Sequence, residues 1–314
     1  MTPRFILLVV LALSGRSLTA ADAPKAPTID DLLKLKTIGG SQISPDGHAV
    51  AYGVSEADFE HDAFVTNIWI AREGAPPLQL TRGQKSASGF RWSPDSRWLA
   101  FLSSRVGDKT QIFAIRPDGG EAIQLTNIES DVSSLEWSPD GTRIAFTSTR
   151  DGNSEIYVVN RDGSNVRRLT NSGAIDSTPT WSPTGTQVAF TSDRTGTPQI
   201  YIVGADGLGL RQLTHESYAD RPTWSPAPYN EIAYTARTGP GNDIKVIELS
   251  SGQVRQLTFG EGTNESPSFS ANGRHIAFMS TRSGKSQIFT ISKDGKDLRQ
   301  ITRVGNNFQP DWSK

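Results

Sequence analysis

The side chains that could carry out chemistry are present but scattered along the 314-residue chain. The four histidines, His48, His61, His215 and His275, have no spacing typical of metal ligands, and there is no cysteine to act as a nucleophile or thiolate ligand. No Gly-x-Ser-x-Gly sequence occurs, so the serine elbow of an α/β-hydrolase is missing. The sequence therefore predicts no catalytic residue, no metal site and no cofactor.

Carboxylates are numerous, with 33 Asp and Glu residues. Two carboxylates that face each other could hydrolyse a glycosidic bond, and turn carboxylates could bind Ca²⁺. Asp46, Asp95 and Asp140 each follow a Ser-Pro pair, which is typical of a turn. We interpret them first as turn formers, and carbohydrate chemistry or a bound Ca²⁺ stays open.

Five arginines recur at intervals of 43 to 45 residues, namely Arg105, Arg150, Arg194, Arg237 and Arg282. Guanidinium groups bind carboxylates in a planar, bidentate way. Each arginine could pair with an acid or carbonyl of the protein itself, or the five could form a rim for an acidic partner. Which of these roles applies depends on the secondary-structure elements that position the arginines.

One sequence unit is repeated with a period of 43 to 49 residues. Its marker is Trp-Ser-Pro or a near relative, and the marker serines are Ser44, Ser93, Ser138, Ser182, Ser225, Ser270 and Ser313. A period of this length is typical of propellers and solenoids. We therefore interpret the chain as an array of repeats.

Each unit predicts four short strands. A tight turn such as Ser138-Pro139-Asp140-Gly141 follows the first strand, and the second has alanine at its centre, as in Ile144-Ala145-Phe146. The third contains a pair such as Ile156-Tyr157, and the fourth ends in a pair such as Leu169-Thr170. Six units predict an all-β fold, a six-bladed β-propeller of four-stranded antiparallel blades over residues 37–314.

A seventh marker, Phe308-Gln309-Pro310-Asp311-Trp312-Ser313, follows the sixth unit. A first strand needs a sheet, and residues 37–43 of the first unit are Gly-rich and lack the Trp. We expect the C-terminal strand to enter the first blade and close the ring, with residues 37–43 displaced or paired beside it. The sequence leaves open which segment becomes the inner strand.

From about Thr149 to Lys314 the chain resembles the TolB-like propellers of the Tol-Pal system. The segments that carry the resemblance are Ser154 to Tyr157, Asp162 to Thr170, Arg255 to Gly262, Asn264 to Ser270 and Pro310 to Ser313. Residues 28–150 are more similar to the N-terminal propeller of the prolyl oligopeptidase family, in Thr28 to Leu35 and Ile43 to Gly47. The first resemblance implies a periplasmic protein that binds a Pal-like lipoprotein.

The alternating strand directions place the five arginines on the same face as the connections between blades. In TolB-like propellers this face receives Pal, so the resemblance implies partner contacts there. Besides the arginines, the implied contact residues are Asp176, Ser177, Asp220, Asn264, Glu265, Asn307 and Phe308.

The function we expect is a non-catalytic platform for protein–protein interaction in the cell envelope. One alternative is a stand-alone gating propeller related to the prolyl oligopeptidase family. The other is a carbohydrate-active propeller that uses loop carboxylates or a metal in the channel.

The N-terminus predicts export. Arg4 precedes the apolar run Phe5 to Leu13, and small and polar residues follow up to Ala23, with cleavage expected after Ala20 or Ala23. Nine apolar residues are too few to span a bilayer, so we interpret residues 1–20 as a cleaved signal peptide and residues 21–36 as an N-terminal extension. A formal net charge of −1 argues against nucleic acid as a partner. We expect a periplasmic monomer with a protein partner and no membrane insertion.

Overall fold

The structure, a computed structural model, describes residues 28–312, and the predicted signal peptide lies outside them. Within the described residues the chain divides into two units, residues 28–35 and 36–312. The described part of the first unit contains the short helix α1 (Ile29–Leu33). Thr28 caps this helix, because its Oγ1 accepts a hydrogen bond from Asp31 N at 3.2 Å while Asp31 Oδ2 accepts one from Thr28 N at 3.0 Å.

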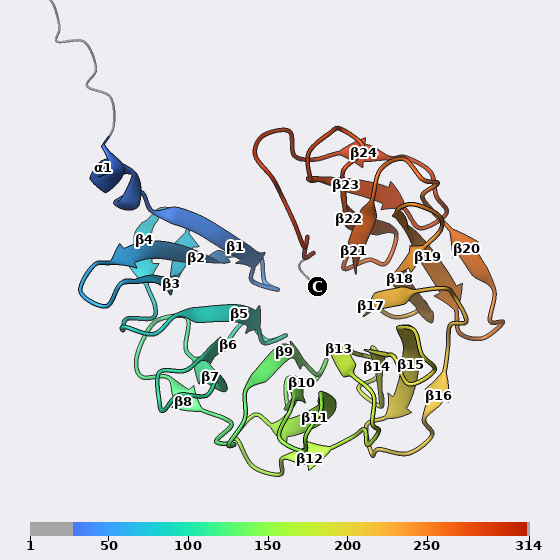
Figure 1. Ribbon diagram of the computed structural model, residues 1–314, viewed down its shortest axis with the longest axis horizontal. Helices are drawn as coiled ribbons and strands as arrows, with labels where there is room; N and C mark the ends of the chain where they lie inside the picture. The colour runs from blue at the N-terminus through green and yellow to red at the C-terminus, as the bar shows by residue number, and fades with distance from the viewer. Residues whose placement is uncertain (1–27, 313–314) are drawn as a thin grey trace, which may run out of the picture. The chain divides into compact units, whose positions relative to one another are not determined.

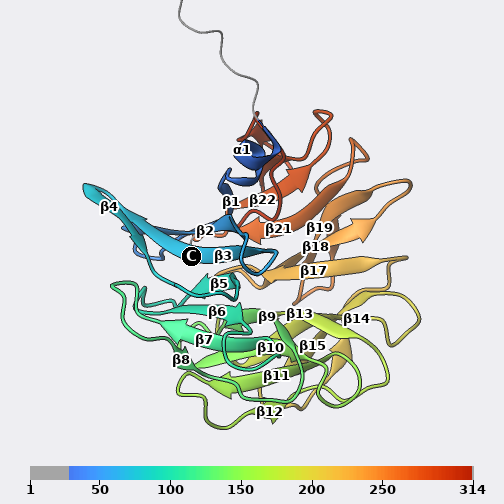
Figure 2. The same ribbon diagram turned by 60° about the vertical axis from the view of Figure 1, so that its left-hand side comes forward.

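The second unit is built from six four-stranded antiparallel sheets, which follow one another around a hub in chain order (Figures 1 and 2). Blade 1 contains β1 (Thr37–Ile43), β2 (Ala49–Asp58), β3 (Ala63–Arg72) and β4 (Ala75–Gln79); blade 2 contains β5 (Ala87–Trp92), β6 (Leu99–Ser103), β7 (Gln111–Ile115) and β8 (Ile123–Gln124); blade 3 contains β9 (Val132–Trp137), β10 (Arg143–Ser148), β11 (Glu155–Asn160) and β12 (Arg167–Arg168). Blade 4 contains β13 (Asp176–Trp181), β14 (Gln187–Ser192), β15 (Gln199–Gly204) and β16 (Arg211–Gln212); blade 5 contains β17 (Ala219–Trp224), β18 (Glu231–Arg237), β19 (Asn242–Glu248) and β20 (Val254–Gln256); blade 6 contains β21 (Asn264–Phe269), β22 (His275–Ser280), β23 (Gln287–Ser292) and β24 (Arg299–Gln300). The predicted six-bladed propeller is confirmed.

The core consists of layers between neighbouring blades. In β10, Ile144 and Phe146 join the cluster that contains Ala100 and Ile112 of blade 2. Ala145 points the other way, into the cluster that contains Trp181 of blade 4. The alternation of a strand thus assigns large residues to one interface and alanine to the next, where a small side chain lets the sheets approach closely.

A Leu-Thr pair, Ile-Thr in blade 6, follows each fourth strand and attaches it to the third. Thr170 Oγ1 accepts a hydrogen bond from Ile156 N at 2.9 Å and donates one to the buried Glu155 carboxylate. Equivalent threonines occur in the other five blades, where Thr81, Thr126, Thr214, Thr258 and Thr302 each accept the backbone N–H of the third-strand isoleucine.

The Ser-Pro-Asp-Gly turns are fixed by hydrogen bonds. Ser138 Oγ donates to Asp140 Oδ1 at 2.6 Å and accepts from Arg143 N at 2.9 Å. Gly141 has a φ of 65°, the left-handed conformation that glycine adopts without strain. Asp46 and Asp95 make the same contact with Ser44 and Ser93, so the interpretation of these carboxylates as turn formers is confirmed.

The prediction that the C-terminal segment enters blade 1 is wrong for the residues that the structure describes. β1 pairs with β2 from Thr37 opposite Ser55 to Ile43 opposite Val50, so the inner edge of β2 is already occupied. The C-terminal segment instead turns back toward the hub after β24 (Figure 1). It bridges blades 6 and 1, since Trp312 N donates to Ser268 Oγ at 3.0 Å and Asp311 Oδ2 accepts from Gln42 Nε2 at 2.6 Å.

Candidate functional site: the loop face

One face of the ring carries the loops between the second and third strand of each blade and the connections between blades, and we call it the loop face. The opposite face carries the Ser-Pro-Asp-Gly turns, and we call it the turn face. On the loop face, hydrogen bonds join the loops within a blade to the connections between blades. Asn153, in the loop between β10 and β11, donates to Ser172 O of the next inter-blade connection at 3.0 Å. On the opposite face, Ala205 N donates to Thr186 O at 2.8 Å, which joins two turns of blade 4.

The five repeated arginines pack against aromatic rings of their own blades. The ring under each guanidinium, at 4.0 to 5.1 Å, is Phe101 for Arg105, Tyr157 for Arg150, Tyr201 for Arg194, Tyr218 for Arg237 and Phe289 for Arg282. The side chains of Arg194 and Arg282 are only 18% and 12% exposed. These contacts favour the structural role that the sequence left open.

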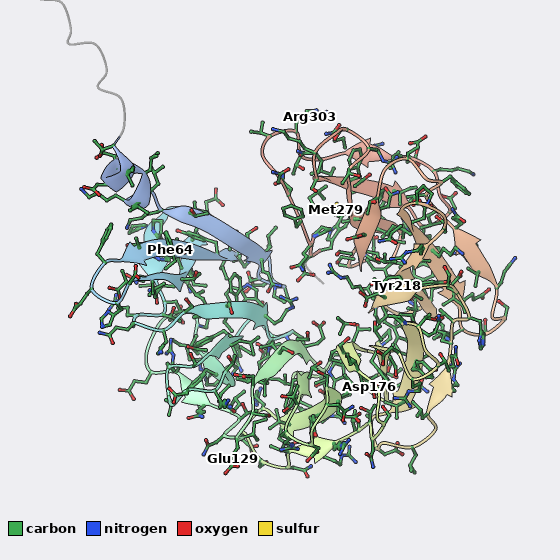
Figure 3. All side chains as sticks on the ribbon, viewed as in Figure 1. Phe64, Glu129, Asp176, Tyr218, Met279 and Arg303 are labelled. Carbon is green, nitrogen blue, oxygen red and sulfur yellow. The ribbon has the colours of Figure 1, made fainter. Side chains whose placement is uncertain are left out.

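Arg194 compensates a buried carboxylate. Its Nη2 lies 2.7 Å from Oδ2 of Asp176, whose side chain is fully buried. Asp176, labelled in Figure 3, is the first residue of β13. Burial raises the pKa of Asp176. Burial also opposes the charge of nearby Glu155, yet hydrogen bonds from Ser172 N, Thr170 and Arg168 lower the pKa of Glu155. The Arg194 guanidinium therefore offsets part of the cost of burying the Asp176 carboxyl.

Polar side chains of blades 4 to 6 form a connected network at the inner rim of the loop face. Asp220 Oδ1 accepts a hydrogen bond from Thr191 Oγ1 at 2.9 Å, and Asp220 Oδ2 accepts one from Tyr218 OH at 3.0 Å. Arg221 Nη1 donates to Ser266 Oγ of the next blade at 2.6 Å. Burial and the Asp220 carboxylate raise the pKa of Tyr218 to about 12, so its hydroxyl stays a donor.

Every inner strand bulges at the same place. The bulge residues have positive φ, and they are Gly40, Gly89, Ser134, Thr178, Arg221, Ser266 and, in the C-terminal segment, Gln309. Left-handed backbone is unfavourable for residues with a Cβ atom, above all for the β-branched Thr178. Strain of this kind clusters at binding sites, where it aims side chains.

Large apolar side chains also stand out on the loop face. Ile175, Phe259, Val304 and Phe308 lie in inter-blade connections and are between 56% and 87% exposed. The loop face thus combines apolar anchors with polar groups that are held in place, which is the composition of a protein-binding surface.

The implied contact residues differ in accessibility. Asp176 and Asn264 are fully buried and hold Arg194 and Arg282. Ser177, Asp220, Glu265 and Asn307 are half-buried, and Phe308 is exposed. Sequence reasoning did not name Arg221, Ser266, Ile175, Phe259 and Val304 as contacts. Ile175, Phe259 and Val304 lie in inter-blade connections of irregular sequence, whereas Arg221 and Ser266 lie at the bulges of β17 and β21.

A second feature that the sequence did not single out is a cavity of about 380 Å³ at the turn-face end of the channel. Its walls include Trp92, Trp137, Trp181, Trp224 and Trp312. Three of these indole N–H groups donate to a backbone carbonyl of the preceding blade: Trp92 to Gln42 O, Trp137 to Arg91 O and Trp181 to Glu136 O. The repeated Trp-Ser-Pro marker was the signal for this ring.

Within residues 28–312 no group of three or more His, Asp or Glu side chains is placed to hold a metal ion. The histidines have separate surroundings. His61 Nδ1 lies 2.9 Å from Asp58 Oδ2, and the His275 ring stacks on Trp312. In the same range no helix has the length and apolar character needed to cross a membrane.

The fold and its repeats define the class of protein, a β-propeller built from TolB-type repeats. The sequence profile of the PD40 family, described as the TolB beta propeller domain, matches residues 122–314. The chain belongs to this family.

Individual relatives come from both branches that the sequence resembles. The uncharacterized peptidase YuxL of Bacillus subtilis is 36% identical over 96 residues, which are 30% of this chain and 15% of YuxL. The crystal structure of TolB from Acinetobacter baumannii matches with a TM-score of 0.65 and 21% identity, covering 88% of this chain and 82% of that one. A puromycin-hydrolyzing peptidase of Mycobacterium tuberculosis matches with a TM-score of 0.72 and 14% identity, covering 90% of this chain and 49% of the peptidase. At these identities the two structures show the fold alone.

Proposed function

We propose that this chain is an exported, non-catalytic TolB-like propeller that works in the periplasm and binds a protein partner through its loop face. The partner we propose is a Pal-like lipoprotein. The observation that carries the proposal is the rim of the loop face, where exposed apolar side chains surround a network of positioned polar groups.

The residues divide into two roles in this proposal. Phe308, Ser177, Asp220, Glu265 and Asn307 contact the partner, together with the exposed Ile175, Phe259 and Val304. The arginines, with Asp176 and Asn264, position the loops that carry these groups. Arg194 and Arg282 donate to Asp176 and Asn264, and Arg105, Arg150 and Arg237 stack on aromatic rings. Rigid loops lose little conformational entropy when a partner binds, which favours affinity.

The test is binding of the purified mature chain to the purified periplasmic domain of the Pal-like lipoprotein from the same genome. We expect saturable binding in isothermal titration calorimetry. The double substitution Ile175→Ala and Phe259→Ala removes two exposed anchors and is expected to weaken binding at least tenfold.

A matched control is Leu208→Ala, because Leu208 is 70% exposed in a turn of the opposite face. Its affinity should equal that of the unsubstituted chain. Equal losses in both variants, or no binding of the lipoprotein domain, would contradict the proposal.

A gating propeller for a separate peptidase is the second candidate, and the 36% identity to the uncharacterized peptidase YuxL over 96 residues favours it. It predicts that the chain binds a hydrolase that lacks a propeller and slows cleavage of long peptides more than that of short ones. Cleavage rates of a long and a short substrate, with and without the chain, distinguish the two functions.

A further inference from the structure

Blade 1 and blade 6 each leave uncovered the sheet face that other blades bury. The second- and third-strand aromatic residues of blades 2, 3 and 4 are at most 4% exposed, as for Phe101 and Tyr157. The equivalent pair of blade 1, Tyr52 and Trp69, is half-exposed. Trp69 Nε1 is buried and finds no hydrogen-bond partner among the described residues.

The inner strand of blade 1 shows the same difference. β5, β9, β13, β17 and β21 each bury several residues, whereas β1 buries none. Ile38 and Ile43 of β1 are 70% and 52% exposed. Apolar side chains in this position are covered in the other blades by the blade that precedes them.

On blade 6 the uncovered residues lie on β23. Ile156 and Val158 of blade 3 face blade 4 and are at most 3% exposed. Their counterparts in blade 6, Ile288 and Thr290, are half-exposed. The blade 6 face that carries Ile288 and the blade 1 face that carries Tyr52 both line the space between blades 6 and 1, which we call the interval.

The C-terminal segment crosses this interval with the geometry of an inner strand. Asn307 N donates to Ser286 O at 2.8 Å, as Asp176 N does to Ser154 O at the start of β13. Two residues later comes the left-handed residue, Gln309 here and Thr178 in β13, and Trp312 occupies the position of Trp181. In the described residues, however, no second strand pairs with Phe308 to Trp312.

We propose that Phe308 to Trp312 is a docking edge for an antiparallel β-hairpin of another protein, which fills the interval between blades 6 and 1. Backbone pairing with an exposed edge gives affinity, and alternate side chains give specificity. This edge shares Phe308 with the loop-face contacts proposed above, but it does not include the anchors Ile175 and Phe259, whose substitution tests the other proposal.

The repeat indicates the chemistry of the hairpin. Each inner strand of the ring pairs with a strand in which alanine stands between an aliphatic and an aromatic residue. In that arrangement the large residues pack against the preceding blade and alanine faces the following one. The partner strand should therefore place an aliphatic and an aromatic side chain against Ile288 and Thr290, and small or aliphatic ones against Tyr52 and Trp69.

The probe is a synthetic peptide with the sequence of residues 143–160, which form β10 and β11 of blade 3. We expect one peptide to bind per full chain and to slow amide hydrogen exchange at Phe308, Gln309 and Asp311 at least tenfold. A peptide with aspartate at the positions of Ile144 and Phe146 should not bind, because both large apolar contacts are lost.

A chain variant locates the site. Ile288→Asp should weaken peptide binding at least tenfold, while Leu208→Asp, which places the same charge on an exposed turn-face position, should leave it unchanged. The Ile288 side chain lies outside the blade 5–blade 6 core cluster, so the fold should persist in the variant, as near-ultraviolet circular dichroism can verify.

Three results would overturn the proposal. They are the absence of saturable peptide binding, equal affinities of the Ile288→Asp and Leu208→Asp variants, and a self-associated chain in which the amides of Phe308, Gln309 and Asp311 exchange slowly without peptide. The last result would assign the edge to a second copy of the chain.

Discussion

The two ends of the channel are built from the same repeat, but they differ in what they leave exposed. At the turn face, Trp137 and Trp181 are at most 5% exposed and donate hydrogen bonds to the preceding blade. At the loop face, Phe259 is 72% exposed and the neighbouring bulges are strained. The comparison suggests that the turn face contributes stability and that the loop face can change without loss of the fold.

The largest effect should come from the turn face. Trp181→Ala removes a buried ring, its hydrogen bond to Glu136 O and the stacking of Arg143, which should lower the free energy of unfolding by about 3–5 kcal/mol. Urea denaturation measures the loss. Phe259→Ala on the loop face should change the same free energy by less than about 0.5 kcal/mol, and a similar loss in both variants would remove the distinction between the faces.

The arginines test whether part of the loop face is structural. Arg194→Ala leaves the buried Asp176 carboxylate without its cation and should cost about 3 kcal/mol. Arg237→Ala removes a stacking contact with the half-buried Tyr218 and should cost less than about 1 kcal/mol.

The pH dependence of the Arg194→Ala variant has a defined sign. Burial already raises the pKa of Asp176, and loss of the guanidinium raises it further, so the folded variant takes up a proton more readily than the unfolded chain. The stability deficit should therefore shrink as the pH falls through the carboxyl range. A deficit that grows toward acid pH would show that Asp176 is not the group left uncompensated.

The sequence predicted the blades well because their markers are local. Ser138 and Asp140 fix their turn through contacts within five residues, and the alternation of Ile144, Ala145 and Phe146 is fixed by the strand itself. Such interactions recur in each repeat and can be recognised without knowledge of the ring.

The closure and the site depend on contacts between distant segments, which the sequence does not contain. Residues 37–43 and 308–312 are both candidates for the inner strand of blade 1, and only the pairing of β1 with β2 decides between them. In the same way, the sequence does not distinguish the five evenly spaced arginines. In the structure, only Arg194 and Arg282 bind the buried Asp176 and Asn264.

The inner-strand bulge tests the strain on the loop face. Ser134 has a φ of 52° and an exposed side chain, so Ser134→Gly should relieve strain and raise the free energy of unfolding by about 1 kcal/mol. The reverse change at the same place in blade 2, Gly89→Ser, should destabilise, because an added Cβ would meet Leu102 Cδ1 at 2.9 Å. Equal and negligible changes in thermal unfolding temperature would mean that the bulges store no strain.

The smallest effect is expected at the turn carboxylates. The Ser44 hydroxyl, which donates to Asp46 Oδ1 at 2.6 Å, lowers the pKa of Asp46 below its usual value of 3.8, and the His48 N–H adds to this. Asp46 therefore stabilises the fold above that pH, and its contribution is lost as the pH falls through the lowered pKa.

Asp46→Asn keeps the acceptor, as Asn272 does naturally in blade 6, where it accepts from Ser270 Oγ at 2.8 Å. The variant should lose less than about 1 kcal/mol at neutral pH, because the group is exposed to solvent, and its urea midpoint should converge with that of the unsubstituted chain in acid. Midpoints that diverge as the pH falls would show that the charge of Asp46, rather than its oxygen as an acceptor, works against the fold.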